Sequence, residues 1–218
     1  MKGGLLLNTF YNGKKQNSSY YIKSNGRNEE IEINRLTLKL KKVIQESAVE
    51  NKTIVFLCIG SDRYVGDSLG PLVGTMLLDS RVPYQVYGTL EEPIHAFNLK
   101  GTIKEIHKQF NKPLIISIDA CLGNKDQVGY VVFKEGPLAP GKALEKMLPE
   151  VGDYHFQGIV NYIDPLPTSQ FLNDTRLYMV MNLAKIISTV VTKIATVENV
   201  AEDEINALDN VRQLDDFK

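Results

Sequence analysis

Two aspartates, Asp67 and Asp119, lie where acidic side chains can carry out acid–base chemistry. Asp119 follows the apolar run 114–118, and Asp67 lies in the loop after a second apolar run, which ends at Ile59. In an open α/β sheet, sites form beyond the carboxyl ends of the strands, so neighbouring strands would bring both carboxylates to one crevice. Paired carboxylates can share a proton, so that one acts as a base on a water and the other as an acid. They can also hold a metal ion.

Both aspartates also have purely structural interpretations. Asp67 could cap the helix expected to follow it, because aspartate is a favoured N-cap residue. Asp119 could accept hydrogen bonds from loop amides beyond its strand. Residue type and spacing alone leave the catalytic and structural interpretations open.

His155 is the histidine considered as a third member of such a site. It lies in the segment 152–158, which contains turn residues and is expected to be a loop. Two carboxylates and one imidazole would suit a borderline divalent metal, although a lone histidine more often has a structural role. Asp67, Asp119 and His155 are therefore the candidate metal ligands, and a divalent metal is the one cofactor considered.

Other familiar catalytic patterns do not occur. Gly60, Gly66 and Gly70 surround Asp67, but no Gly-Lys-Ser, Gly-Lys-Thr or GxGxxG pattern accompanies them, so a nucleotide site is not expected. No serine lies in a Gly-x-Ser-x-Gly elbow, and Ser117 is expected to be packed within its strand.

Strands and helices alternate along the chain, which predicts an α/β fold with a parallel or mostly parallel sheet covered on both faces. The run 53–59 is apolar throughout, as in a strand buried on both sides, and Pro71 suits the first turn of a helix. The predicted strands are 53–59, 84–87, 114–118 and 128–133. The predicted helices are 33–49, 68–78, 93–110, 142–148 and 169–197, with a loop-rich segment over 151–167 that contains short extended pieces.

Length and composition indicate one globular domain with polar ends. The 218 residues are 43% hydrophobic and 23% charged, which is ordinary for a globular protein. We assign residues 1–30 to an N-terminal arm or hairpin and 31–197 to the α/β domain. The strongly acidic residues 198–218 are assigned to a C-terminal tail or helix.

The charge and the cysteines limit the compartment and the partners. A net charge of −1 argues against nucleic acid or an anionic membrane as the main partner. The apolar region 177–191 is interrupted by Asn182 and Lys185, so it is expected to be a buried or amphipathic helix. Cys58 and Cys121 form no CxxC, and the apolar stretch near the N-terminus is too short for a secretory signal. A reduced, cytoplasmic compartment is expected, and the oligomeric state is not predicted.

The residues around the two aspartates resemble motifs of known peptidases. Residues 58–73 contain Asp67-Ser-Leu-Gly-Pro and are similar to the first aspartate motif of the germination protease of spore-forming bacteria. Residues 116–120, Ile-Ser-Ile-Asp-Ala, resemble the second motif of that protease. The hydrogenase-maturation endopeptidases share this architecture, with an acidic residue three places before the glycine and a later aspartate. They also have a histidine in a downstream loop, which His155 resembles.

Residues 30–195 as a whole resemble the YyaC-type sporulation proteins of Bacillus and its relatives. The resemblance implies a three-layer α/β/α fold of the phosphorylase/hydrolase-like class, with a twisted, mostly parallel mixed sheet. It also implies a peptidase-like hydrolase of the sporulating cell or spore, which uses Asp67 and Asp119 on a protein or peptide substrate.

The chain departs from these peptidases in two respects. The germination protease is longer and is made with a propeptide, to which nothing here clearly corresponds, although the polar N-terminal segment could serve as one. The maturation enzymes recognise nickel in their partner subunit, which does not imply a metal in this chain. A non-catalytic peptide- or protein-binding module on the same scaffold, with or without a metal, is therefore the alternative function.

Overall fold

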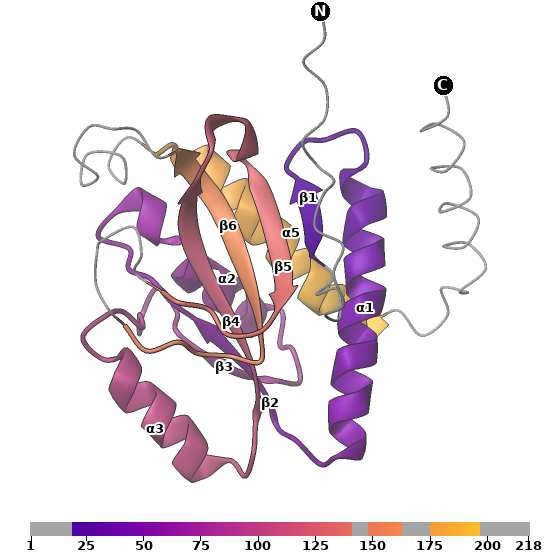
Figure 1. Cartoon of the computed structure of the whole chain (residues 1–218), viewed down its shortest axis with the longest axis vertical. Helices are drawn as coiled ribbons and strands as arrows, with labels where there is room; N and C mark the ends of the chain where they lie inside the picture. Colours follow the sequence, from indigo (N-terminus) through magenta and orange to yellow (C-terminus); the bar gives the residue numbers. More distant parts are fainter. Residues whose placement is uncertain (1–18, 141–147, 163–174, 197–218) are drawn as a thin grey trace, which may run out of the picture.

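Strands and helices alternate in the structure, a computed structural model that describes residues 19–140, 148–162 and 175–196 (Figure 1). The strands are β1 (Tyr20–Lys23), β2 (Ile54–Cys58), β3 (Gln85–Tyr87), β4 (Leu114–Gly123), β5 (Tyr130–Glu135) and β6 (Tyr154–Tyr162). The α-helices are α1 (Glu29–Val49), α2 (Leu69–Asp79), α3 (Leu99–Gln109) and α5 (Leu177–Thr196), and the short 3₁₀ helices are η1 (Val65–Asp67) and η2 (Lys125–Gln127).

The six strands form one mixed sheet in the order β1-β5-β6-β4-β2-β3. β2 pairs in parallel with β3 and β4, and β4 pairs in parallel with β6. β5 runs antiparallel to β6, and β1 runs antiparallel to β5. The predicted α/β class with a mixed sheet is confirmed. Because β2, β3 and β4 are parallel, their carboxyl ends lie along the same edge of the sheet.

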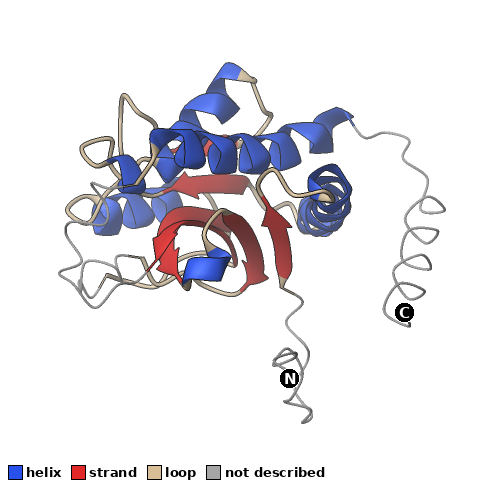
Figure 2. Cartoon of the chain, turned by 90° about the horizontal axis from the view of Figure 1, so that it is seen from above, coloured by secondary structure: helices blue, strands red, loops and turns tan. Residues whose placement is uncertain are grey.

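Apolar side chains pack on both faces of the sheet. Phe56 and Cys58 of β2 belong to the core formed with α1, α2 and α5, whereas Val55 and Leu57 belong to the core formed with α3. This alternation explains the uninterrupted apolar sequence of β2, since both of its faces are covered. Figure 2 shows α5 lying across one side of the strands. The helix residues in the two cores include Leu36, Leu40, Val73, Leu77, Val180 and Ile187 in the first, and Leu99 and Ile106 in the second.

Helix α5 is a core helix. By length and composition its stretch Leu177–Ile194 could cross a membrane, but half of that stretch is buried inside the structure. It contacts α1, α2 and β6, and Leu183, Ile187 and Val190 are fully buried. The prediction of a buried helix is therefore confirmed. The helix begins at Leu177, later than predicted, and the two residues before it, Thr175 and Arg176, are not helical.

The segment predicted to be rich in loops contains a long strand. β6 covers Tyr154–Tyr162, so the expectation that His155 lies in a loop is wrong. The strand is inserted between β4 and β5, and its side chains alternate between the two faces of the sheet. Phe156 and Val160 enter the larger core, while His155 and Gln157 face the other side. None of its residues is exposed, although His155 and Gln157 are polar.

Strand β4 is longer than predicted. It continues through Asp119 to Gly123, because β6 keeps pairing with it as far as Tyr162. β2, its other neighbour, ends its pairing at Cys58, opposite Ile118. Asp119 therefore lies inside β4, at the point where β2 has already ended.

The predicted helix 93–110 is correct only in its second half. α3 begins at Leu99. Asn98 holds the preceding turn, since its side chain accepts a hydrogen bond from the His95 amide (2.7 Å) and donates one to the Pro93 carbonyl (3.0 Å). Ile94 forms a parallel bridge with Ile59, which is incompatible with a helix at that point.

Several predictions fall on residues outside those described. They concern residues 1–18 of the arm, the helix over 142–148 apart from Leu148, the first part of the helix 169–197, and the acidic segment 198–218. Within the segment 1–30, Tyr20–Lys23 forms β1 and pairs with β5.

The start of α2 lies unusually close to the end of β2. A β-carbon added to Gly70 would overlap the backbone of Ile59. Only glycine has no side chain, so only glycine permits this approach. The Gly-Pro pair of residues 70–71 thus sets both the position and the first turn of the helix.

We expect Gly70→Ala to lower the free energy of unfolding by about 1–3 kcal/mol, because the new methyl group must displace backbone. The matched control is Gly101→Ala in α3, where an added β-carbon meets no atom within 4 Å. That variant should gain up to about 1 kcal/mol from higher helix propensity. Urea denaturation followed by circular dichroism measures both, and a Gly70→Ala variant as stable as wild type would contradict the packing described.

Candidate functional site

The loop that carries Asp67 is closed by its own backbone. Gly60, with φ of +143°, begins the loop, and its amide donates to the Ile94 carbonyl (2.8 Å). The Ser61 amide donates to the Asp67 carbonyl (3.0 Å), and the Asp67 amide donates to the Tyr64 carbonyl (2.9 Å). Asp67 is thus returned to the carboxyl end of β2, where its side chain is half-buried.

Asp67 is not the N-cap residue of α2. That position belongs to Ser68, whose hydroxyl donates to the Val65 carbonyl (2.7 Å) and does not cap the helix. Asp67 is the last residue of η1, which packs against β4 and α5. The structural interpretation of Asp67 as a helix cap is therefore wrong.

Asp119 is almost fully buried at the same edge of the sheet. Its side chain is 7% exposed, and its Oδ1 accepts a hydrogen bond from the Ala120 amide (2.8 Å). The donor is a backbone amide, but Ala120 lies inside β4 and is not one of the loop amides expected beyond the strand. The preceding carbonyl, of Ile118, accepts from the Ile59 amide (2.7 Å), so Asp119 lies where the chain leaves β2 for the Asp67 loop. The structure therefore places the two aspartates on neighbouring segments at the carboxyl end of β2, where Asp119 lies inside the longer strand β4.

His155 lies on the same face of the sheet as Asp119, but nearer the start of the strands. It pairs with Ser117, whereas Asp119 pairs with Gln157. Its Nδ1 is 2.8 Å from the Gly136 carbonyl, which can only accept, so Nδ1 carries the proton. Burial lowers the pKa of His155, and the nearby charge of Lys134 lowers it further, although the hydrogen bond to Gly136 opposes both. The ring is therefore held neutral, with Nε2 as an acceptor.

Polar side chains on this face form a row across three strands. The row consists of Lys134 in β5, His155 and Gln157 in β6, and Ser117, Asp119 and Cys121 in β4. Sequence reasoning did not assign Lys134, Gln157 or Cys121 to the site. The alternation of polar and apolar residues over 155–157 was the signal for Gln157, but the pairing with Lys134 required the strand order.

Neither cysteine is suited to be a nucleophile. Burial, with a contribution from the charge of Asp119, raises the pKa of Cys121 to about 12. Cys58 is completely buried, which also raises its pKa. A thiol reacts as its thiolate, so both side chains are inert near neutral pH. Ser117 is also engaged, because its buried hydroxyl donates to the Val151 carbonyl (2.9 Å), as the sequence predicts. The carboxylates remain the candidates for chemistry.

The described residues do not form a metal site of three protein ligands. Among them, no three histidine, cysteine, aspartate or glutamate side chains come close enough together to hold an ion. The pairing of β4 with β6 also separates two of the predicted ligands. His155 is offset from Asp119 by two positions along the strands, about 7 Å. We therefore derive no metal chemistry from this arrangement.

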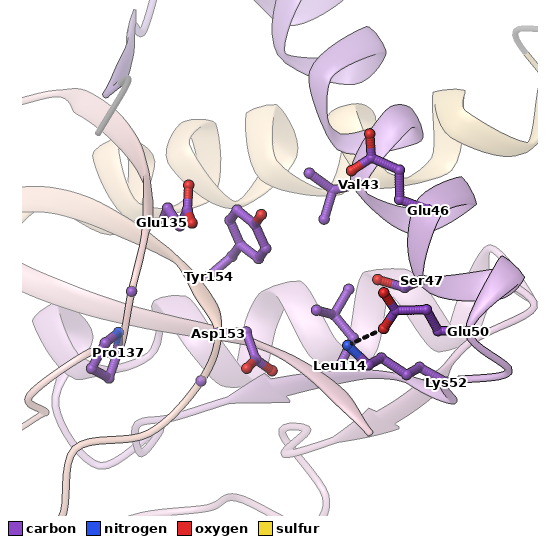
Figure 3. Close-up of a pocket in the computed structure, with 12 residues that line it drawn as sticks. Val43, Glu46, Ser47, Glu50, Lys52, Leu114, Glu135, Pro137, Asp153 and Tyr154 are labelled. Carbon is purple, nitrogen blue, oxygen red and sulfur yellow. Dashed lines mark ion pairs between the residues drawn. The ribbon is translucent and has the colours of Figure 1, made fainter. Parts of the chain in front are cut away.

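A separate acidic cavity of about 450 Å³ opens at the other end of the strands (Figure 3). Glu46 and Glu50 of α1 line it together with Glu135 and Asp153. Lys52 pairs with Glu50 at 2.6 Å. Leu114, at this cavity, and Asp119 are separated by about 16 Å of β4. The cavity is therefore distinct from the aspartate site.

Comparison with known proteins places the chain in a family. Residues 24–190 match the family described as "Protein of unknown function (DUF1256)". The chain is also similar to the "Uncharacterized protein YyaC" of Bacillus subtilis (strain 168). The two are 48% identical over 138 residues, which cover 63% of this chain and 67% of that protein. The matched region contains both aspartates, His155 and every strand of the sheet except β1. The chain is therefore a member of the DUF1256 family and a YyaC-type protein.

Proposed function

We propose that this protein is a peptidase-like hydrolase that acts on a protein substrate in sporulating cells, with Asp67 and Asp119 as its catalytic residues. The observation that supports it most strongly is their placement. Asp119 lies where β2 ends, and the loop from β2 brings Asp67 back to that point. This is the edge of a parallel sheet where active sites form. The germination-protease-like sequence around both aspartates adds to this support. The same resemblance underlies our proposal of a three-layer, phosphorylase/hydrolase-like fold, which agrees with helices on both faces of the sheet.

The proposed chemistry needs two carboxyl groups in different protonation states. One carboxylate removes a proton from a water molecule, and the water oxygen then attacks the carbonyl carbon of the peptide bond. The other carboxyl group donates its proton to the amide nitrogen that leaves, so that charge is balanced when the bond breaks. Proton sharing between two carboxyl groups favours this division of roles.

His155 is proposed to position the substrate. Its Nδ1–H is committed to the Gly136 carbonyl, and a neutral ring leaves Nε2 free to accept from a substrate N–H. It lies on the Asp119 face of the sheet but two positions nearer the start of the strand. A role in orienting an extended substrate fits this offset better than direct participation in proton transfer.

A non-catalytic peptide-binding module is the second candidate function. The observation in its favour is that Asp119 already accepts a hydrogen bond from the Ala120 amide at 2.8 Å. A carboxylate engaged in this way can have the purely structural role of fixing the backbone next to the end of β2. On this alternative the crevice would hold a peptide without cleaving it.

We expect Asp67→Asn and Asp119→Asn each to reduce cleavage by about a hundredfold or more, because an amide cannot exchange the proton. The measurement is mass spectrometry of new peptide termini after an extract of sporulating cells is treated with each protein. The matched control is Asp62→Asn, an exposed aspartate in the same loop, which should cleave like wild type. Full activity in both catalytic variants would rule out the mechanism, and no cleavage by folded wild type would favour the binding module.

The lowered pKa of His155 predicts acid sensitivity. The unfolded chain binds a proton near the ordinary value of 6.5, whereas the folded chain binds it only at lower pH. The contribution of His155 to stability is therefore complete above pH 6.5 and is lost as the pH falls below it. We expect His155→Gln to lose less stability than wild type between pH 7.5 and 5, as measured by urea denaturation. His107→Gln, at an exposed position, is the control and should follow wild type; a His155→Gln profile that also follows it would contradict a neutral, buried ring.

A further inference from the structure

The outer edge of β3 is bordered by a groove. β3 is the last strand in the sheet order, and among the described residues no strand pairs with its outer side. A cavity of about 810 Å³ lies there, lined by Val86, Tyr87 and the residues that follow them. An edge strand with open backbone groups can take up an extended peptide as an additional strand.

Both walls of this groove are helical and come from opposite faces of the sheet. Leu78 lies near the end of α2, which covers one face, and Thr102 and Glu105 belong to α3, which covers the other. A cavity lined by both helices must pass across the edge of the sheet. An added strand would therefore lie between α2 and α3, with its side chains pointing alternately to each wall.

The two walls differ in chemistry. On the α2 side, Leu78 is 51% exposed, and Val86 packs at the margin of the larger core. On the α3 side, Tyr87 packs at the margin of the smaller core, and the charge of Glu105 adds to the effect of burial in raising the pKa of Tyr87. Glu91 and Glu92 add two further carboxylates, and the described residues that line the groove include neither lysine nor arginine. The walls thus complement apolar and basic side chains respectively.

The groove is connected to the proposed active site through the backbone. The Gly60 amide, at the start of the Asp67 loop, donates to the Ile94 carbonyl, and Ile94 lines the groove.

The loop that lines the groove is held in place by hydrogen bonds within the protein. The Leu90 amide donates to the Thr75 hydroxyl (3.0 Å), and the Glu92 amide donates to the Thr89 hydroxyl (3.0 Å). A ligand would therefore not have to order this loop.

We propose that an extended peptide segment, in which apolar and basic residues alternate, binds this groove by adding a strand to the outer edge of β3. For the hydrolase, this inference deepens the proposed function by naming the substrate class: a protein with a basic, extended segment close to its cleavage site. The strand would supply backbone hydrogen bonds, and the carboxylates would select the basic side chains.

The test is fluorescence anisotropy with a dye-labelled octapeptide of alternating valine and arginine, titrated with the full chain carrying Asp119→Asn. We expect saturable binding, weakened about tenfold by Glu92→Gln/Glu105→Gln. The matched control is Glu46→Gln/Glu135→Gln, which removes the same charge at the cavity of Figure 3 and should change binding by less than about twofold. The same octapeptide with every backbone amide methylated should not bind, because neither of its edges can donate hydrogen bonds to a strand.

Equal weakening by both double variants, or equal binding of the methylated peptide, would overturn the inference. The result is separable from the proposed function, because binding is measured in a variant that cannot cleave. Groove-dependent binding without cleavage by wild type would keep the groove assignment and reject the hydrolase. Cleavage that is unaffected by Glu92→Gln/Glu105→Gln would keep the hydrolase and reject the groove.

Discussion

The position of the residues at the carboxyl edge of the sheet depends on one constraint. The start of α2 and the loop before it must approach the end of β2 very closely. A side chain at Gly70 would overlap the Ile59 backbone, and one at Gly60 would overlap the Asp67 carbonyl. Because both residues are glycines, the loop can turn back onto the end of β2, the strand that it leaves. The position of Asp67 is therefore a consequence of backbone packing around Gly60 and Gly70.

Burial then decides which groups on the polar face remain charged. It raises the pKa of Cys121 and lowers that of His155, so both side chains are neutral near pH 7. The positive charge of Lys134 lowers the pKa of both groups. Its strand, β5, lies beside β6, which carries His155. The result is a row in which thiol and imidazole are uncharged and the acid–base capacity rests with the carboxyl groups.

Local signals explain which parts of this fold the sequence could predict. β2 and α2 were predicted because an unbroken apolar run and a Gly-Pro pair specify them within a few residues. Only short extended pieces were predicted where β6 lies, because one long strand there depends on β4 and β5 on either side of it. His155 was assigned to a loop for the same reason. α3 was started too early because the side chain of Asn98 holds the preceding turn.

The same distinction between local signals and strand order applies to the candidate site. Asp67 and Asp119 could be selected from residue type and their positions after apolar runs, and the structure brings both to one edge of the sheet. The offset of His155 from Asp119 could not be foreseen, since it is set by the register between β4 and β6. Gln157 and Lys134 share this face for reasons of strand order, which no local pattern records.

The length of β3 has a kinetic consequence. The strand has only three residues, so its open side offers few backbone groups to any chain that pairs with it. Such a short edge gives a second copy of this protein little to pair with, and short edge strands protect against aggregation. It would also keep the dwell time of a paired segment brief, so that release would not limit turnover.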